Sequence, residues 1–371
     1  MKQFTIMPKI LSFDTAKEYF SYKKITSNDL VFAGGAVCKI LSKYIENAAY
    51  IVDFATLPKG EPTDILVEQI YSQIKEINYS RVVAIGGGTV LDTAKLFALM
   101  KFSPVVDLFL GKYPAIKDKD LTLIPATCGT GSEVTNISIL ELTSINSKFG
   151  LAVDELYADE AVLIPELINS LPFKFFASSS IDALVHSIES FTSPKASEFS
   201  KLFSKKAMVM ILEGFKKIAA EGEQARFEYM DKFLTASCFA GIAFGNAGCA
   251  AVHAMSYPLG ANFHVPHGEA NYALLTAVYK KYMQIQSDGA IAELNEVLAE
   301  TLECITEKVY DELENLLNKL IQKQPLHNYG MKKSEIETFA DSVLEKQTRL
   351  MSNNFVTLKK NDLTEIYNSV F

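Results

Sequence analysis

The sequence is poor in cysteine, in basic residues and in long apolar runs, and each shortage excludes a class of protein. Its five cysteines are scattered over 371 residues without a CxxC spacing, which excludes a disulfide framework or a thiolate zinc knuckle and predicts reduced thiols. Asp and Glu (44) outnumber Lys and Arg (36), so that the net charge is −8. An acidic chain without a basic stretch is not expected to bind nucleic acid.

No segment has the apolar character of a signal-peptide core or of a membrane span. The N-terminal residues, MKQFTIMPKILSFD, lack a long apolar run, and we therefore expect a cytoplasmic protein. The uncharged stretch from Cys238 to Met255 is interrupted by glycines, Asn246 and His253. We interpret this stretch as buried and glycine-rich, and we expect no membrane partner.

Length and composition favour two globular domains. A chain of 371 residues exceeds the common size of one domain, and 49% hydrophobic with 22% charged residues is the composition of a folded protein. Over residues 1–170, short β-rich runs alternate with helical patterns, which predicts an α/β domain with a parallel sheet. Over residues 171–371, apolar residues recur at helical spacing, which predicts an all-helical domain. We expect the two domains to leave a ligand-binding cleft between them.

The expected elements can be assigned to residue ranges. Strands are expected at 31–33, 50–54, 81–85, 121–124 and 161–164, and a hairpin at 137–142 and 149–153. Helices are expected at 63–77, with Pro62 in the first turn, and at 89–100, directly after a run of glycines.

A glycine turn between a strand and a helix is the first candidate site. Gly86, Gly87 and Gly88 precede Thr89 and a helix that carries Asp92. Glycines let the backbone approach an anion closely, and a helix N-terminus offers unpaired N–H groups to a pyrophosphate. Neither the GxGxxG fingerprint nor the P-loop pattern is present, so that neither an ordinary Rossmann dehydrogenase nor an NTPase is favoured.

Two further features can complete a nucleotide site. Asp53 closes an expected strand, where a carboxylate can bind the hydroxyls of a ribose; a solvated loop aspartate is an equally good interpretation of that spacing. The run IPATCGTGSE, residues 124–133, supplies the hydroxyls of Thr127, Thr130 and Ser132. A loop that follows a parallel strand lies at the carboxyl edge of the sheet, where open α/β sheets bind ligands.

The strongest signal is a group of histidines in the helical part. Asp182 and His186 are four residues apart in a helical pattern, so that both side chains leave one helix face. His253 and His267 follow, and with His264 and His186 they account for four of the five histidines of the chain. One carboxylate and three imidazoles suit Fe(II), Zn(II) or a similar divalent ion. A lone helical histidine is more often part of a core, but their concentration favours a metal site.

Four segments of the chain resemble the motifs of a known family. GGGTVLDTAK, PATCGTGSEVTN, SSIDALVHSIES and VHAMSYPLGANFHVPHGEAN are similar, in order and spacing, to those of the iron-containing (group III) alcohol dehydrogenases. Further segments, DELYADEAVLIPE and YGMKKSEIETFADSVLE among them, narrow the resemblance to members that interconvert 4-hydroxybutyrate and succinate semialdehyde. The resemblance implies an α/β dinucleotide-binding domain, an all-α metal-binding domain, and an oxidoreductase that uses NAD and a metal.

The resemblance also implies roles for individual residues. The implied metal ligands, for Fe(II) or else Zn(II), are Asp182, His186, His253 and His267. The implied NAD-binding residues are Asp53, Gly87, Gly88, Thr89, Asp92, Thr127, Thr130 and Lys148. A small-molecule substrate and a homodimer or higher homo-oligomer are implied as well.

At one position the sequence departs from the family pattern. Many members carry a proton-transferring histidine four residues after the third metal ligand, and this chain has Tyr257 there. We expect Tyr257 and the ligand His267 at the reacting end of the site, although a packed aromatic is an open alternative for Tyr257. His264 is a candidate for the substrate carboxylate, with a structural role in the loop as the simpler interpretation.

Two other functions stay open at this point. Within the family, the substrate can be another small primary alcohol or a polyol, such as glycerol or a diol. In a different class, a metal-dependent hydrolase or lyase would use the same Asp and His residues to activate water, but it would have no use for a dinucleotide turn.

Overall fold

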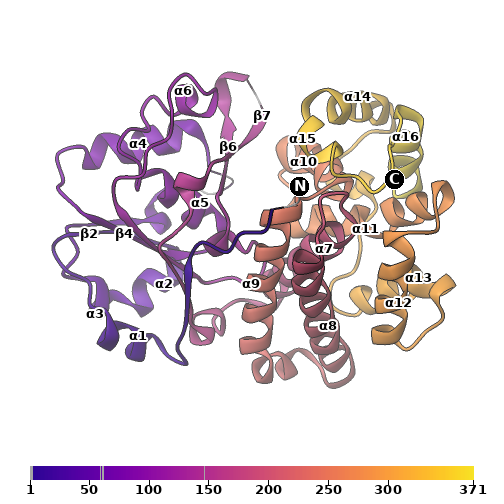
Figure 1. Cartoon of the computed structure of the whole chain (residues 1–371), viewed down its shortest axis with the longest axis horizontal. Helices are drawn as coiled ribbons and strands as arrows, with labels where there is room; N and C mark the ends of the chain where they lie inside the picture. The colour runs from indigo at the N-terminus through magenta and orange to yellow at the C-terminus, as the bar shows by residue number, and fades with distance from the viewer. Residues whose placement is uncertain (1–2, 59, 61, 146) are drawn as a thin grey trace. The chain divides into compact units, whose positions relative to one another are not determined.

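The computed structural model describes residues 3–58, 60, 62–145 and 147–371, and the chain divides into two compact units. One comprises Ile6–Leu171, and the other comprises Met1–Thr5 together with Pro172–Phe371. The α/β elements and the purely helical elements fall in separate units (Figure 1). The N-terminal residues belong to the helical unit, which the sequence pattern did not indicate; there the Thr5 N–H donates to Asn246 Oδ1 at 2.7 Å.

Six parallel strands form the sheet of the α/β unit, in the order β1-β8-β5-β4-β2-β3. The strands are β1 (Lys9–Ser12), β2 (Asp29–Ala33), β3 (Tyr50–Asp53), β4 (Arg81–Gly86), β5 (Asp120–Pro125) and β8 (Glu160–Leu163). β4 and β5 are neighbours in register, with Gly86 opposite Pro125. The segments that follow these two strands therefore leave the same edge of the sheet side by side.

Helices cover both faces of this sheet. Figure 1 shows the first three helices on one face and the next three on the other. They are α1 (Ala16–Tyr22), α2 (Gly35–Ile40), α3 (Ser42–Ile45), α4 (Asp64–Ile74), α5 (Gly88–Leu96) and α6 (Val105–Phe109). Parallel sheets require such cover because their strands are apolar on both sides.

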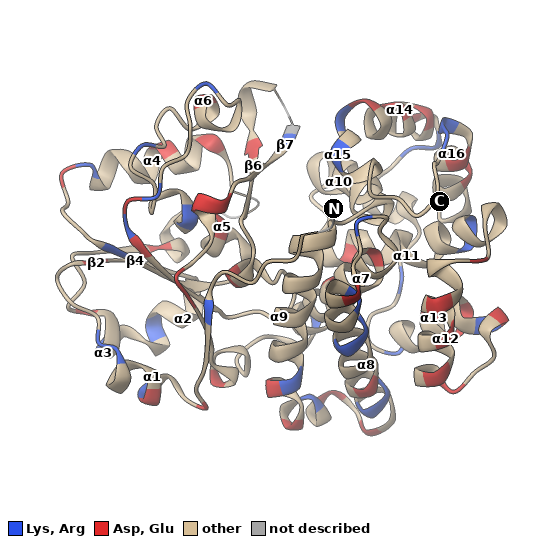
Figure 2. Cartoon of the chain, in the orientation of Figure 1, with Lys and Arg blue, Asp and Glu red and all other residues tan. Residues whose placement is uncertain are grey.

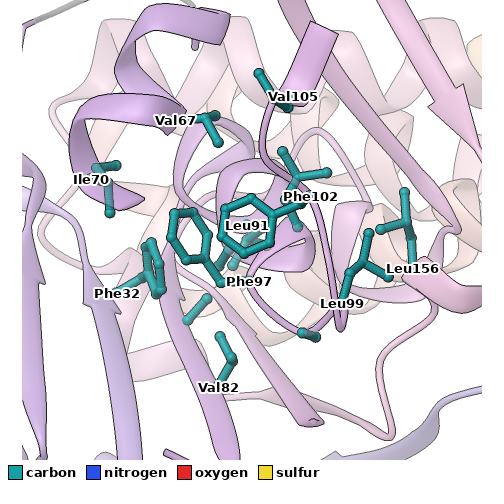
Figure 3. Close-up of a cluster of buried hydrophobic side chains, with 14 of the residues drawn as sticks. Phe32, Val67, Ile70, Val82, Leu91, Phe97, Leu99, Phe102, Val105 and Leu156 are labelled. Atoms are coloured by element: carbon teal, nitrogen blue, oxygen red, sulfur yellow. The ribbon is translucent and has the colours of Figure 1, made fainter. Parts of the chain in front are cut away.

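Alternate residues of the central strands enter two separate cores. Val82 and Ala84 lie in the cluster with α4, α5 and α6, whereas Val83 and Ile85 lie in the cluster with α1 and α2, as the two-residue period of a strand dictates. Figure 3 shows the first cluster, in which the ring centroids of Phe97 and Phe102 are 4.5 Å apart. These cores fix the strands whose carboxyl ends carry the candidate nucleotide site.

The structure confirms most of the expected elements and corrects some of their ends. The hairpin forms as β6 (Ile137–Leu142) and β7 (Ser147–Ala152), which pair antiparallel; Asn146 in its turn lies outside the described residues. The short edge strand β1 was not expected, because its exposed side chains give it no apolar pattern.

Two expected helices are shorter in the structure. α4 begins at Asp64 because Thr63 is its N-cap, accepting the Leu66 N–H at 3.1 Å, so that Pro62 precedes the cap instead of lying in the first turn. α5 ends at Leu96, not at residue 100, since tight three-residue turns follow it and the Met100 N–H then donates to Ile116 O at 2.8 Å.

The second unit has no strand among its described residues. Its helices are α7 (Phe173–Thr192), α8 (Glu198–Glu221), α9 (Met230–Ala247), α10 (Ala251–Phe263), α11 (His267–Ile285), α12 (Ala290–Leu302), α13 (Val309–Asn318), α14 (Ile336–Lys346), α15 (Thr348–Met351) and α16 (Lys360–Ser369). α7, α8 and α9 pack against one another (Figure 1). All five cysteines of the chain are free thiols.

Within the described part of the chain, no single helix is long and apolar enough to cross a membrane. The pair α9 and α10 passes by length and composition together but is bent by 105°, and most residues of both helices are buried. Acidic and basic residues are interspersed over both units (Figure 2), and many pair, as Lys280 does with Asp311 at 2.6 Å.

Candidate functional site

The glycine turn after β4 packs directly against the loop after β5. A Cβ atom on Gly88 would lie 2.8 Å from Thr130 Cγ2, and one on Gly87 would lie 3.2 Å from Thr127 Cγ2. Gly86 has no room either, because a Cβ there would lie 2.6 Å from Val90 Cγ2. The structure thus brings Thr127 and Thr130 onto the turn that opens α5, where free backbone N–H groups can meet an anion.

A largely buried ion pair within α5 ties this helix to the loop after β5 and to β6. Lys95 is fully buried, and its Nζ donates to Ser132 Oγ at 2.8 Å and to the Ile137 carbonyl at 2.6 Å. Asp92 accepts from Ser132 Oγ at 2.5 Å and from the Ile139 N–H at 3.1 Å, with Lys95 Nζ 3.6 Å away. The carboxylate of Asp92 is thus engaged inside the unit, and it acts on the turn through Ser132.

Burial shifts the ionisation of both partners of this pair. It raises the pKa of Asp92 and lowers the pKa of Lys95, while the attraction between the two opposes each shift. Sequence reasoning missed Lys95. The only available signal was its position three residues after Asp92 in the same helix, which places the two side chains on one face.

Glu133, the last residue of the loop motif, is a buried carboxyl group. Its side chain is 1% exposed, and its Oε1 has no hydrogen-bond partner among the described residues. Burial raises the pKa of Glu133 to about 7, and Lys95 offsets this only in part. The neutral acid is therefore the favoured form below neutral pH.

This shift predicts that the stability of the chain falls as the pH rises toward neutrality. The folded pKa of Glu133 lies above the ordinary 4.5, so that its contribution is full below about pH 4.5 and is lost as the pH passes 7, by about 3 kcal/mol at most. Glu133→Gln should remove this pH dependence. Relative to the wild type, the unfolding midpoint of the variant should therefore be higher at pH 8 than it is at pH 5. Identical pH dependence of unfolding in variant and wild type would contradict the assignment.

Asp53 and Lys148 belong to elements other than those that form the turn. Asp53 ends the edge strand β3, which β2 separates from β4, and its carboxylate accepts the Ala55 N–H at 2.8 Å. Lys148 belongs to β7 of the hairpin, outside the parallel sheet. Thr89 lies in the first turn of α5.

In the helical unit, three helices contribute the candidate metal ligands. α7 carries Asp182 and His186, α10 carries His253, and α11 begins at His267. α11 can approach α7 because Gly268 has no side chain: a Cβ there would lie 2.0 Å from the Ser178 carbonyl oxygen.

Three of the four expected ligands converge. Asp182 Oδ1 lies 3.7 Å from His253 Nε2 and 3.6 Å from His267 Nε2, and one ligand atom from each lies within 4.8 Å of the others. The amide of Asn271 faces all three, with Nδ2 2.7 Å from Asp182 Oδ1 and 3.2 and 3.3 Å from the two imidazoles. Asn271 Oδ1 is buried without a partner among the described residues.

His186 lies in a second group. Its ring stacks between those of Phe244 and His253, at centroid distances of 4.2 and 4.6 Å, and it groups with His253 and Cys249 within 4.8 Å. His253 is common to both groups, and the imidazole of His186 also acts on Asp182, whose pKa it lowers.

Glu189 orients the shared histidine. Its carboxylate lies 2.6 Å from His253 Nδ1 and accepts the backbone N–H groups of Ala250 and Val252 at 2.9 and 2.6 Å. Such a bond directs the other ring nitrogen, Nε2, toward a metal. Sequence reasoning missed Glu189, although its place seven residues after Asp182 puts it on the same face of α7.

The electrostatics fit a divalent cation. Burial would raise the pKa of Asp182, but the imidazoles of His186, His267 and His253 outweigh it and hold that pKa below its usual value. Burial would lower the pKa of His253, but Cys249 and Glu189 raise it well above normal. A carboxylate and two imidazole nitrogens that converge in this way are a donor set for an ion such as Fe(II) or Zn(II).

The remaining expected residues take different places. Tyr257 is 8% exposed, one helical turn after His253, and its ring centroid lies 6.1 Å from that of His267. His264 is exposed and ends α10 in the left-handed conformation, φ 54°, its N–H donating to the Gly260 carbonyl at 3.0 Å. Its backbone therefore caps the helix, and His264 belongs to neither group of possible metal ligands found among the described residues.

Comparison with known proteins finds one family for both units. Residues 15–165 match the model described as iron-containing alcohol dehydrogenase, and residues 176–371 match the C-terminal model of the Fe-containing alcohol dehydrogenase family. The 4-hydroxybutyrate dehydrogenase of Clostridium kluyveri is 44% identical over 371 residues, covering 100% of both chains.

Solved structures share the fold. An iron-containing alcohol dehydrogenase from Thermococcus thioreducens superposes with a TM-score of 0.85 at 24% identity, covering 99% of each chain. A sulfoacetaldehyde reductase from Bifidobacterium kashiwanohense, solved with NAD+, superposes with a TM-score of 0.85 at 21% identity, covering 100% of this chain and 98% of that one.

Proposed function

Because the chain belongs to the iron-containing alcohol dehydrogenase family, we propose that it interconverts 4-hydroxybutyrate and succinate semialdehyde by NAD-dependent hydride transfer at a divalent metal. The convergence of Asp182, His253 and His267 within 4.8 Å is the observation that carries the metal-dependent chemistry. The full-length identity of 44% to a relative named for 4-hydroxybutyrate supports the substrate.

The metal ligands of this proposal are those of the histidine group. Asp182, His253 and His267 would hold the ion, with Fe(II) favoured and Zn(II) as the alternative. His186 would join as a fourth ligand after a side-chain adjustment, since it now stacks on His253. Glu189 would hold His253 in the tautomer that metal binding needs.

The cofactor of this proposal is NAD. Gly87, Gly88 and Thr89 would receive the pyrophosphate at the N-terminus of α5, and Thr127 and Thr130 would line the adenosine side. Asp92 would act by positioning Ser132 rather than by touching the cofactor. Lys148 would lie near the nicotinamide ribose, and Asp53 near the adenosine ribose, where its charge would disfavour the extra phosphate of NADP.

The chain's own residues would align and ionise the substrate. When bound, the metal would act as a Lewis acid toward the substrate's terminal oxygen, and the nicotinamide would accept or return hydride. Tyr257, beside His267, would hydrogen-bond that oxygen. The buried walls formed by Asp182 and His253 would exclude water.

A substrate panel tests this function. Metal-reconstituted protein is assayed for NADH formation with ω-hydroxy acids, simple primary alcohols, glycerol and diols, each with NAD and with NADP. We expect 4-hydroxybutyrate with NAD to give the highest kcat/KM. A preference for glycerol or a diol would assign a different substrate of the same family. Equal use of NADP would contradict the role of Asp53. No NADH formation with any alcohol would favour a hydrolase.

His264 is the candidate for the distal carboxylate of the substrate. His264→Asn keeps a residue that tolerates the left-handed conformation and removes the imidazole. If the assignment holds, the KM for 4-hydroxybutyrate rises while the KM for an uncharged alcohol stays constant.

We further propose that the protein is cytoplasmic and forms a homodimer or a higher homo-oligomer. Sedimentation of the purified chain would test the oligomeric state.

Tyr257→Phe is predicted to lower kcat without loss of stability. The change removes only the hydroxyl, and the loss of a positioned proton donor costs on the order of 10²-fold. Tyr257→His should shift the pH optimum toward neutrality, because an imidazole titrates near 6.5 and a phenol near 10. Wild-type kcat and an unshifted pH profile in Tyr257→Phe would leave this residue as packing.

Gly88→Val is predicted to raise the KM for NAD by roughly tenfold or more, about 1.4 kcal/mol. The added side chain meets Thr130 Cγ2, 2.8 Å from the new Cβ, and displaces the loop from the turn. Gly88→Ala should give a smaller effect in the same direction. Metal content serves as the control, since it depends on the other unit; unchanged NADH affinity in a folded variant would mean that the turn is only structural.

A further inference from the structure

Arg349 is an arginine whose side chain has no partner among the described residues. The sequence has three arginines. Arg81 donates to both carboxylate oxygens of Asp29, at 2.7 and 2.6 Å, and the guanidinium of Arg226 lies 4.7 Å from the ring centroid of Phe227. The Arg349 side chain is exposed, and within the described chain it makes no hydrogen bond or ion pair. Its five N–H donors are therefore available to a ligand.

The segment that carries Arg349 is packed against the start of α10. α15 contacts α10, and Asn353 Nδ2, just after α15, donates to the Cys249 carbonyl at 3.0 Å. A Cβ atom on Gly248 would lie 2.3 Å from the same nitrogen, so that the contact depends on glycine there. Leu350, the neighbour of Arg349, is buried. The backbone of Arg349 is thus held in place by packing on both sides.

Cys249 connects this segment to the histidine group. One atom each of Cys249, His253 and His186 lies within 4.8 Å of the others. Burial raises the pKa of the Cys249 thiol, and the positive charges of His253 and Arg349 oppose that shift. The charge of Arg349 therefore acts in the region of the helical unit that holds the proposed metal ligands.

We propose that Arg349 binds the carboxylate of an ω-hydroxy acid whose hydroxyl oxygen lies at the proposed metal site, and that it thereby selects the substrate class. This inference rests on the proposed function and names the residue that would distinguish an acid from an uncharged alcohol. A guanidinium fork matches a carboxylate through two parallel N–H···O bonds. 4-Hydroxybutyrate is on the order of 6 Å long, given carbon–carbon bonds of about 1.5 Å, so that one molecule can meet the metal ligands and a nearby cation together.

The charges around the proposed metal site favour a cation for such a substrate. Asp182 and Glu189 are buried carboxyl groups on α7, and a substrate carboxylate brought near them would be repelled without a compensating positive charge. His264, the other candidate for this carboxylate, can offer one N–H when its imidazole is neutral. The guanidinium of Arg349 keeps its charge and offers several donors in a fixed plane.

The ratio of kcat/KM for 4-hydroxybutyrate to kcat/KM for 1,4-butanediol tests this role, because the two substrates have equal length and only the first has a carboxylate. In metal-reconstituted full-length protein, Arg349→Gln should lower this ratio by roughly 10- to 100-fold, the effect of losing a hydrogen bond to a charged group. Arg349→Lys keeps the charge without the fork and should lower it less. The matched control Lys346→Gln removes another exposed cation, at the end of α14, and should leave the ratio unchanged.

Butyrate binding, measured by titration calorimetry, separates this role from the proposed function. Butyrate has the carboxylate but no hydroxyl, so that its binding requires no turnover. If the wild type prefers another alcohol but loses butyrate binding in Arg349→Gln, the proposed substrate is refuted and the carboxylate site stands.

Three results would overturn the inference. The first is a preference for 4-hydroxybutyrate that persists in Arg349→Gln, and its loss in His264→Asn alone would then assign the carboxylate to His264. The second is an equal fall of the ratio in Lys346→Gln, which would indicate a general effect of surface charge. The third is a wild type that binds no butyrate.

Discussion

Asp182→Ala is expected to abolish turnover and to leave the purified chain with little bound iron. The carboxylate lies 3.6 and 3.7 Å from the two imidazole nitrogens of its group, and no other carboxylate belongs to that group. Removal also takes away the charge that would neutralise a divalent ion in a buried site. The measurement is metal content after dialysis, by elemental analysis, alongside kcat.

A graded comparison makes this result specific. Glu189→Gln keeps the shape of the residue that orients His253 and should weaken metal binding by about 10- to 100-fold, which is less than the loss in Asp182→Ala. The secondary structure of both variants is checked by circular dichroism. A full complement of tightly held metal in Asp182→Ala would refute the ligand assignment.

The common helix of Asp182 and His186 could be predicted because their spacing follows helix geometry. Asp182 and His186 are four residues apart, which fixes a common helix face before any tertiary structure is known. The same spacing could not say which partners each side chain meets. His186 stacks on His253 and Phe244, a tertiary packing choice that depends on how α7, α9 and α10 pack together.

The candidate nucleotide site shows the same limit. The glycine run and the loop motif follow neighbouring strands, and the pattern of apolar runs was enough to predict a parallel sheet. The sequence could not reveal the strand order, which places β4 beside β5. Nor could it distinguish a solvated from a buried Asp92, because the partners Ser132 and Ile139 lie 40 and 47 residues away along the chain.

Helix ends were the least predictable feature, for a local reason. Thr63 caps α4 through its hydroxyl, but the preceding Pro62 is equally compatible with a first-turn position. The need for glycine at position 268 comes from tertiary packing, and no local sequence rule predicts it. This glycine lets α11 approach the Ser178 carbonyl of α7, and this contact brings His267 toward Asp182.

Lys95→Met is expected to destabilise the α/β unit by about 3–5 kcal/mol, the usual cost of leaving one partner of a buried ion pair unpaired. Lys95 is fully buried, and its ammonium group ties Ser132, Thr135 and the Ile137 carbonyl to α5. Methionine fills a similar volume but leaves Asp92 charged and without its cation. The variant should also bind NADH more weakly, because Ser132 belongs to the loop that packs on the glycine turn.

The double variant Asp92→Asn/Lys95→Met distinguishes charge from shape. If the uncompensated carboxylate causes the loss, neutralising it should restore part of the unfolding free energy measured in urea by circular dichroism, so that the two changes are not additive. NADH affinity should recover less, because the ammonium bonds to Ser132 and Thr135 are still missing. An unfolding free energy of Lys95→Met within about 1 kcal/mol of the wild type would show that Asp92 is already neutral in the folded chain, and the pair would then be a hydrogen-bonded network rather than an ion pair.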